Sequence, residues 1–180
     1  MARSGADELK ALVRTIPDFP RPGIAFRDVT TLLLDAHGLA AAVEALAATV
    51  DAPIDLVAGI EARGFAIGGA LAVRLGAGLL LIRKHGKLPG ASIAEDYALE
   101  YGTDRLEMHI DACSPGARVL IVDDLIATGG TALAAARLVR RVGGTIAGAR
   151  FLIDLPALGG AAALEAEGIE AIGLVRFDGD

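Results

Sequence analysis

Cysteine and large aromatic residues are scarce in this sequence. It has one cysteine, Cys113, no tryptophan, and only 4% aromatic residues among its 180. One cysteine cannot form an internal disulfide, and the chain opens with charged residues rather than an apolar leader, so we expect a reducing, cytoplasmic setting. Because 53% of the residues are hydrophobic, the core must consist mainly of Ala, Val, Leu and Ile. This composition favours helices packed on a parallel sheet.

Positive charge and long apolar runs are also lacking. The formal net charge is −6 and the pI is about 5.0, which argues against nucleic acid as a partner, because phosphate neutralisation needs a dense basic surface. No apolar stretch reaches the roughly 18 residues that span a bilayer, so we expect no membrane association. The mean hydropathy of +0.52 is nevertheless high. It suggests that a partner subunit covers some apolar surface.

The length is typical of one domain, and the hydrophobic pattern alternates between strand and helix. A short helix over 7–16 and a proline-rich loop over 17–23 precede a helix over 38–50. Predicted strands alternate with predicted helices over 65–75, 131–142 and 158–167, which indicates an α/β fold with an open, mostly parallel twisted sheet flanked by helices. Ligands of such sheets bind beyond the carboxyl ends of the strands. The predicted strands are 56–60, 79–82, 119–122, 146–153 and 170–175.

The strongest motif follows the predicted strand 119–122. Two acids, Asp123 and Asp124, precede a turn of Ala127, Thr128, Gly129, Gly130 and Thr131 that leads into a helix. Glycines let backbone N–H groups approach a phosphate, the helix N-terminus adds partial positive charge, and the hydroxyls can donate hydrogen bonds. Paired carboxylates would repel a bare phosphate, so they suit neutral hydroxyls or a cation, as a ribose phosphate provides. A plain capped turn with two solvated acids is the alternative.

The segment from Asp123 to Thr131 resembles the signature of the type I phosphoribosyltransferases. The resemblance implies that this loop binds the 5-phosphate of 5-phosphoribosyl 1-pyrophosphate (PRPP) and that the two acids contact the ribose 2′ and 3′ hydroxyls. It also implies one domain over 1–180, with a small N-terminal hood over about 1–35 and a flexible β-hairpin lid over about 84–110. Mg²⁺ would bind with the substrate rather than directly to the protein.

Two further segments suit a pyrophosphate. Glu61, Ala62 and Arg63 follow the strand 56–60, and a guanidinium matches phosphate geometry; the segment resembles the family's pyrophosphate loop. Arg83, Lys84 and Lys87 form the one dense basic run, which predicts a local anion site. A surface arginine before a helix and a solvated basic loop are the alternatives. Related enzymes share the basic run across a dimer interface, so the resemblance implies a homodimer.

A long polar insertion lies between Arg83 and Leu106. It resembles the family's catalytic lid, in which Glu100 lies near the leaving pyrophosphate or the incoming base and Tyr101 helps to seal the site. Insertions of this length with little internal structure are commonly lids, and closure would exclude water from the reacting carbon. Glu100 and Arg63 are therefore the catalytic candidates. For Tyr97 we expect simple hairpin packing.

Residues 18–28 resemble the hood of the family members that act on adenine. The resemblance implies that Phe26 stacks on the purine, that backbone groups near Ala25 and Arg27 read its edge, and that Leu155 contacts the base. Two positions depart from the family pattern: Asp154 stands where relatives usually have Glu, and His85 replaces a common Pro or Arg.

These features predict a purine-salvage transferase that converts adenine and PRPP to AMP and diphosphate by direct displacement at the anomeric carbon. A 6-oxopurine needs a fixed cationic donor, and no lysine follows Lys87; a mismatched buried donor discriminates strongly. Two alternatives are a transferase for xanthine or hypoxanthine, and a regulator that only senses the ligand.

Overall fold

The computed structural model describes residues 5–98 and 103–179, and these include a seven-stranded sheet of order β5-β6-β4-β3-β7-β8-β9. Strands β4, β3, β7, β8 and β9 are parallel neighbours, whereas β6 is antiparallel to both β4 and β5. The predicted α/β fold with a mostly parallel sheet is confirmed. The strands are β3 (Leu56–Ile60), β4 (Gly78–Lys84), β5 (Ser92–Ala98), β6 (Thr103–His109), β7 (Arg118–Ile126), β8 (Thr145–Asp154) and β9 (Ala171–Arg176).

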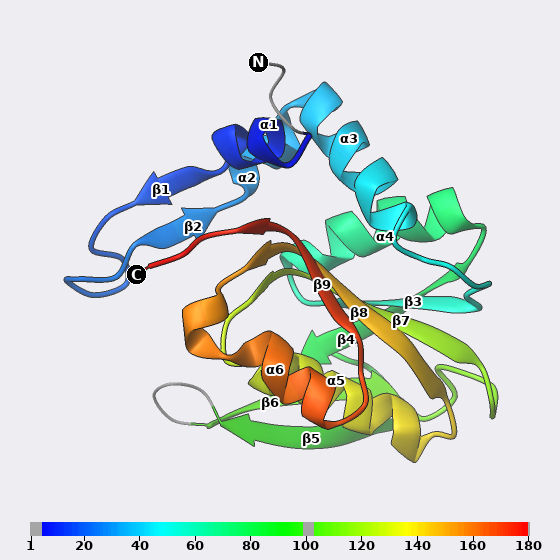
Figure 1. Ribbon diagram of the computed structural model, residues 1–180. Helices are drawn as coiled ribbons and strands as arrows, with labels where there is room; N and C mark the ends of the chain where they lie inside the picture. The colour runs from blue at the N-terminus through cyan, green and yellow to red at the C-terminus, as the bar shows by residue number, and fades with distance from the viewer. Residues whose placement is uncertain (1–4, 99–102, 180) are drawn as a thin grey trace.

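Helices cover both faces of the sheet (Figure 1). Helices α3 (Ala36–Ala47) and α4 (Arg63–Leu75) lie on one face, and α5 (Gly130–Arg141) and α6 (Gly160–Ala166) lie on the other. Each face of the sheet has its own hydrophobic core. Successive strand residues alternate between the two, since Val57 packs on the side of α3 and α4 and Ala58 on the side of α5. Burial on both faces is the reason that these strands are continuously apolar in sequence. Among the described residues, none of the helices has the length and apolar character needed to cross a bilayer.

The hood consists of α1 (Gly5–Leu12), β1 (Arg14–Ile16), β2 (Phe26–Asp28) and α2 (Thr30–Leu34). The prediction of one helix over 7–16 is wrong beyond Leu12, because residues 14–16 form a strand antiparallel to β2. Cross-strand hydrogen bonds outweigh helical periodicity in so short a segment. Residues 17–23 belong to neither helix nor strand, as their prolines predict.

The polar insertion contains the hairpin that the family resemblance implies, because β5 and β6 pair over their full length. Tyr97, which pairs with Asp104 near the end of β5, is buried, and its hydroxyl donates to Asp104 Oδ2 at 3.0 Å. The expectation that Tyr97 packs the hairpin is confirmed. Glu100 and Tyr101 lie outside the described residues.

One buried carboxylate, Asp28, connects the parts of the hood. It forms an ion pair with Arg14 of β1 and accepts hydrogen bonds from the backbone N–H of Thr30 at 3.0 Å and from its hydroxyl at 2.8 Å. These donors, led by the backbone N–H of Thr30 and by Arg14, lower the pKa of Asp28 from 3.8 to about 2. A lowered carboxyl pKa means that the ionised form stabilises the folded protein. This contribution is complete above pH 3.8 and is lost as the pH falls towards 2.

Replacing Asp28 with Asn should therefore destabilise the protein in a pH-dependent way. At pH 7 the free energy of unfolding should fall by about 1–2 kcal/mol, because the charged acceptor is lost. The gap between wild type and variant should narrow as the pH falls from about 4 towards 2, as measured by urea unfolding. The control is Asp51→Asn at an exposed position, and a gap that does not change with pH would contradict this role of Asp28.

Candidate active site

The acid pair lies within β7 rather than after it. The expected end of this strand at Val122 is wrong, because pairing with β8 continues from Asp123, opposite Phe151, to Ile126, opposite Asp154. Strand β8 is ten residues long, so its end reaches far enough to pair with these residues, and the ladder bonds outweigh the low strand preference of Asp. The two carboxylates are thus held on a rigid strand.

The two acids have different surroundings. Burial raises the pKa of Asp123 well above its usual value, and the neighbouring charge of Asp124 raises it further. Asp124 is more fully buried than Asp123, but its Oδ2 forms an ion pair with Nε of Arg63. One charge of the pair is therefore balanced internally, and Asp123 is suited to hydrogen bonding with a neutral hydroxyl.

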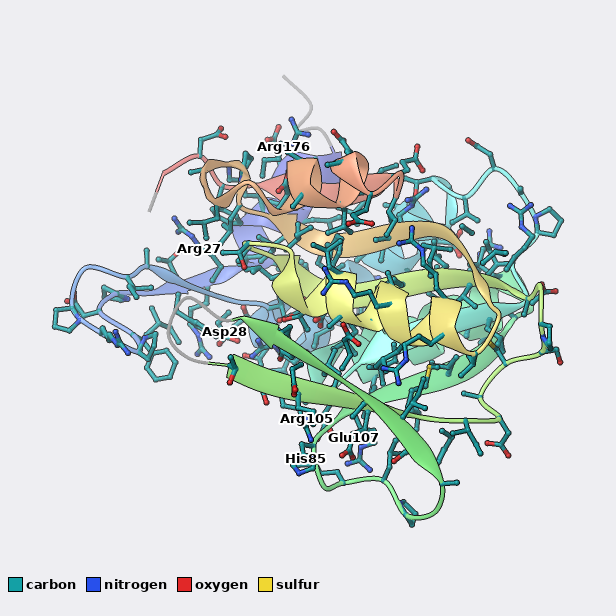
Figure 2. The ribbon with its side chains drawn as sticks, turned by 90° about the horizontal axis from the view of Figure 1, so that it is seen from below. Arg27, Asp28, His85, Arg105, Glu107 and Arg176 are labelled. Carbon is teal, nitrogen blue, oxygen red and sulfur yellow. The ribbon has the colours of Figure 1, made fainter. Side chains whose placement is uncertain are left out.

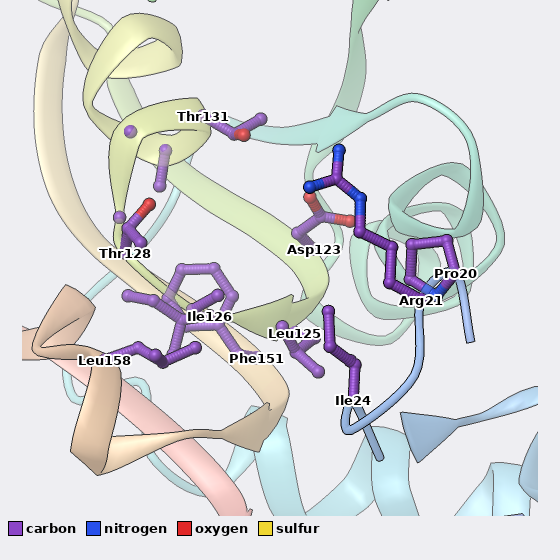
Figure 3. A pocket seen from close by; sticks show the side chains of 14 residues that line it. Pro20, Arg21, Ile24, Asp123, Leu125, Ile126, Thr128, Thr131, Phe151 and Leu158 are labelled. Atoms are coloured by element: carbon purple, nitrogen blue, oxygen red, sulfur yellow. The ribbon is translucent and has the colours of Figure 1, made fainter. Parts of the chain in front are cut away.

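The turn after β7 forms one wall of a pocket of about 480 Å³. Helix α5 begins at Gly130 directly after the turn, so its unpaired N–H groups and the positive end of its dipole lie at this wall. Figure 3 shows Thr128 and Thr131 on the wall, with Asp123 nearby and the hood loop opposite. The lining is Pro20, Arg21, Ile24, Asp123, Leu125, Ile126, Ala127, Thr128, Gly129, Gly130, Thr131, Ala132, Phe151 and Leu158.

Gly160, at the start of α6, supports this turn from behind. Its backbone N–H donates to the carbonyl of Ala127 at 2.9 Å. A Cβ atom at Gly160 would lie 2.3 Å from that carbonyl oxygen and 2.8 Å from the nitrogen of Gly129. The close packing of two backbones therefore fixes the shape of the turn, and it requires glycine at position 160.

Glu61 lies among the backbone and side-chain donors of the basic run, whereas Arg63 of the same predicted set pairs with Asp124. The Glu61 carboxylate accepts hydrogen bonds from Arg83 Nε at 3.2 Å, from the backbone N–H of Lys84 at 2.9 Å and from Lys87 Nζ at 2.7 Å. Burial alone would raise the pKa of Glu61, but these three donors lower it from 4.5 to about 2. Glu61 is thus a charged partner of the basic run.

The hairpin holds the other side of the basic run. Asp104 forms an ion pair with Lys84, and Glu107 lies 2.5 Å from Nδ1 of His85 and accepts from the N–H of Gly86 at 3.0 Å (Figure 2). His85, which departs from the family pattern, therefore has a buried carboxylate partner. The run is fixed between β3 and β6.

The predicted adenine residues lie on two sides of the hood. The Phe26 ring contacts Phe19 edge to face at 5.2 Å, and the guanidinium of Arg63 is 5.7 Å from its centroid. Ala25, Arg27 and Leu155 instead line a second pocket of about 190 Å³. The two pockets share Ile24 and Leu158, so they adjoin beneath the hood.

Asp154 is buried and lies in neither of these two pocket linings. Its Oδ2 is 3.4 Å from Arg176 Nε, and its Oδ1 has no hydrogen-bond partner. Burial raises its pKa, although Arg176 opposes the change. The carboxylate therefore faces β9 and not the pocket.

Several pocket residues carried no prediction. Leu125 and Ile126 stand inside the predicted motif but are typical core residues in sequence. Pro20, Arg21 and Ile24 reach the pocket only because the hood folds over the sheet. The Gly159-Gly160 pair before a helix is a sequence signal for a tight turn. It does not show that Gly160 packs against residues 127–129, because those residues are far away in the sequence. Among the described residues, no three His, Cys, Asp or Glu side chains could together hold a metal ion.

Comparison with known proteins places the chain in a class. Residues 30–161 match the phosphoribosyl transferase domain family. The fold and the strand-acid-glycine site are those of a phosphoribosyltransferase.

Similar proteins narrow the assignment. The adenine phosphoribosyltransferase of Chelativorans sp. (strain BNC1) is 58% identical, over 99% of each chain. The crystal structure of adenine phosphoribosyltransferase from Rhodothermus marinus superposes with a TM-score of 0.90 at 50% identity, covering 96% of this chain and 98% of that one. The APRTase of Giardia lamblia complexed with 9-deazaadenine gives a TM-score of 0.91 at 37% identity, covering 99% and 100%. The chain belongs to the adenine phosphoribosyltransferase family.

Substituting Ala at Gly160 should distort the turn after β7. The added Cβ must displace backbone atoms of residues 127–129, and overpacking of this kind costs about 1–3 kcal/mol. We expect the KM for PRPP to rise at least about tenfold, which 1.4 kcal/mol would produce, with a lower melting temperature. Gly5→Ala is the control, because a Cβ there meets nothing within 4 Å. A normal KM in Gly160→Ala would show that the close packing does not shape the site.

Proposed function

We propose that this protein converts adenine and PRPP to AMP and diphosphate in purine salvage. One observation carries the proposal: Asp123 and residues 127–131 line one pocket with the hood loop. A phosphate-binding turn, hydrogen-bonding acids and a cover for a base are thereby combined. The 9-deazaadenine bound by the Giardia lamblia relative supports adenine as the base.

In the proposed complex the N–H groups and hydroxyls of residues 127–131 bind the 5-phosphate, and Asp123 and Asp124 bind the ribose hydroxyls. Adenine N9 attacks the anomeric carbon as the bond from that carbon to the diphosphate oxygen breaks. The proton on N9 passes to a base in the same reaction, and Glu100 is one candidate for that base. Positive charge develops on the sugar, so fixed carboxylates near it stabilise the transition state.

The diphosphate would leave towards Arg63 and the basic run of Arg83, Lys84 and Lys87. Arg63 and Lys87 already bind carboxylates, so they can exchange one anion for another. Mg²⁺ would accompany the diphosphate and neutralise part of its charge, held through substrate oxygens. Carboxylate and phosphate oxygens are the ligands that this ion prefers.

The base would bind under the hood. Phe26 is the proposed stacking surface, and stacking of a base on an aromatic ring contributes about 1–3 kcal/mol. Backbone groups of Ala25 and Arg27 would read the 6-amino edge, and Leu155 would contact the base. Comparing the formation of AMP with that of IMP, XMP and GMP separates adenine from 6-oxopurines, and we expect AMP alone at a significant rate.

The roles of Arg63 and Glu100 can be tested in the same assay. Arg63→Ala removes a proposed diphosphate ligand, and Glu100→Gln removes the group we propose for proton handling or charge stabilisation. We expect kcat to fall at least about 100-fold in each, as for other losses of charge stabilisation. Arg74→Ala is the matched control, since Arg74 lies on the same helix and pairs with Glu44 on the surface.

Full activity in Arg63→Ala and Glu100→Gln would remove both residues from the mechanism. A wild-type protein that binds PRPP but forms no nucleotide from any purine would instead favour the sensing function.

We also propose a cytoplasmic homodimer that associates through α4 and β4. Val73 is 84% exposed, and Leu79 and Leu81 are 42% and 41% exposed, so these elements present apolar side chains to solvent next to the basic run. Exposed apolar patches commonly mark protein contacts. The variant Leu81→Glu should sediment as a monomer in analytical ultracentrifugation, whereas Leu158→Glu, at an exposed leucine elsewhere, should leave the dimer intact. A dimer in Leu81→Glu would place the interface on another surface.

A further inference from the structure

The last residues of the described chain return to the hood. After β9, residues 177–179 run beside β2 (Figure 1). The backbone N–H of Phe177 donates to the carbonyl of Asp154 at 3.2 Å. This bond attaches Phe177 to the end of β8 and therefore to the rigid sheet.

The Phe177 ring contacts two cations that belong to the hood. The guanidinium of Arg27, in β2, lies over the ring at 4.4 Å from its centroid, and the ammonium of Lys10, in α1, lies over it at 4.7 Å. Both distances are within the range of cation–π attraction. Lys10 also donates to the backbone carbonyl of Arg176 at 2.6 Å. Helix α1 therefore contacts both the Phe177 ring and the residue before it.

These contacts reach the proposed base site. Phe177 lines the smaller pocket together with Ala25, Arg27 and Leu155, and this pocket shares Ile24 and Leu158 with the larger one. Nη1 of Arg27 in turn donates to Thr15 Oγ1 at 2.6 Å, which connects the ring contact to both hood strands. Phe177 thus connects β2 to the end of β8.

We propose that Phe177 is a positioning residue for base binding: its ring anchors Arg27 and Lys10 and so holds the hood over the purine. The inference rests on the proposed function, because it needs the base to bind beneath β2. The same location means that a change at Phe177 should affect adenine binding and not PRPP binding. Phe177 is not among the residues that line the larger pocket with Asp123 and residues 127–131, so PRPP binding should not depend on it.

The test compares the two Michaelis constants in Phe177→Leu, which keeps apolar bulk but removes the ring. We expect the KM for adenine to rise about five- to tenfold, the loss expected for two partly exposed cation–π contacts. The KM for PRPP should stay within about twofold, because a substitution usually has little effect on a site that shares no contacts with it. Phe177→Tyr keeps the ring and should restore the adenine KM to the wild-type value.

Lys10→Met provides an independent test if Phe177→Leu does not fold. It removes one of the two cations and leaves the residues of the proposed base site unchanged. Its adenine KM should rise about two- to fivefold, as one contact would predict. Equal changes in both KM values, or a lower melting temperature with both unchanged, would overturn the inference. A wild-type protein that forms no AMP would refute the proposed function itself. Normal wild-type activity with an unchanged adenine KM in these variants refutes only the role of Phe177.

Discussion

The ion pair between Arg63 and Asp124 joins the separate parts of the site. Asp124 belongs to the central strand β7, Arg63 begins helix α4, and the same guanidinium lies 5.7 Å from the Phe26 ring of the hood. A buried carboxylate without a partner is costly, so this contact also allows two adjacent acids to remain inside a sheet. A second close approach holds the two elements together, because a Cβ at Gly64 would lie 2.8 Å from the carbonyl of Val122. These two contacts hold the proposed pyrophosphate loop against the acids of β7.

Much of the sheet and the turn could be predicted because their signals are local. A continuous apolar run predicts a strand buried on both faces, and β3 appears at Leu56–Ile60 as expected. The Thr-Gly-Gly-Thr turn predicts a helix start, which α5 makes at Gly130. The proximity of Glu61 to Arg83 and Lys87 follows from parallel strands, since β3 and β4 end at one edge.

The remaining features depend on contacts between distant segments. Residues 14–16 continue a helical pattern, yet they form a strand because β2 supplies partners across a proline loop. Strand β7 continues through two acids because β8 is long enough to pair with them. Neither partner is visible within a local window. The split of the predicted adenine residues between two adjoining pockets has the same origin, because it depends on how the hood lies against Leu155 and Leu158.

The cations proposed to bind a highly charged anion in this acidic chain are held in place by its own carboxylates. Arg83 and Lys87 bind Glu61, Lys84 binds Asp104, and Arg63 binds Asp124. Each cation is thereby positioned before any ligand arrives, and the cost of ordering its side chain is met during folding. An incoming diphosphate would replace carboxylates that are already present. Its net binding free energy is therefore the difference between the contacts that it forms and the carboxylate contacts that it breaks. Such an exchange suits a product that must leave after each turnover, because binding that is too favourable would slow its release.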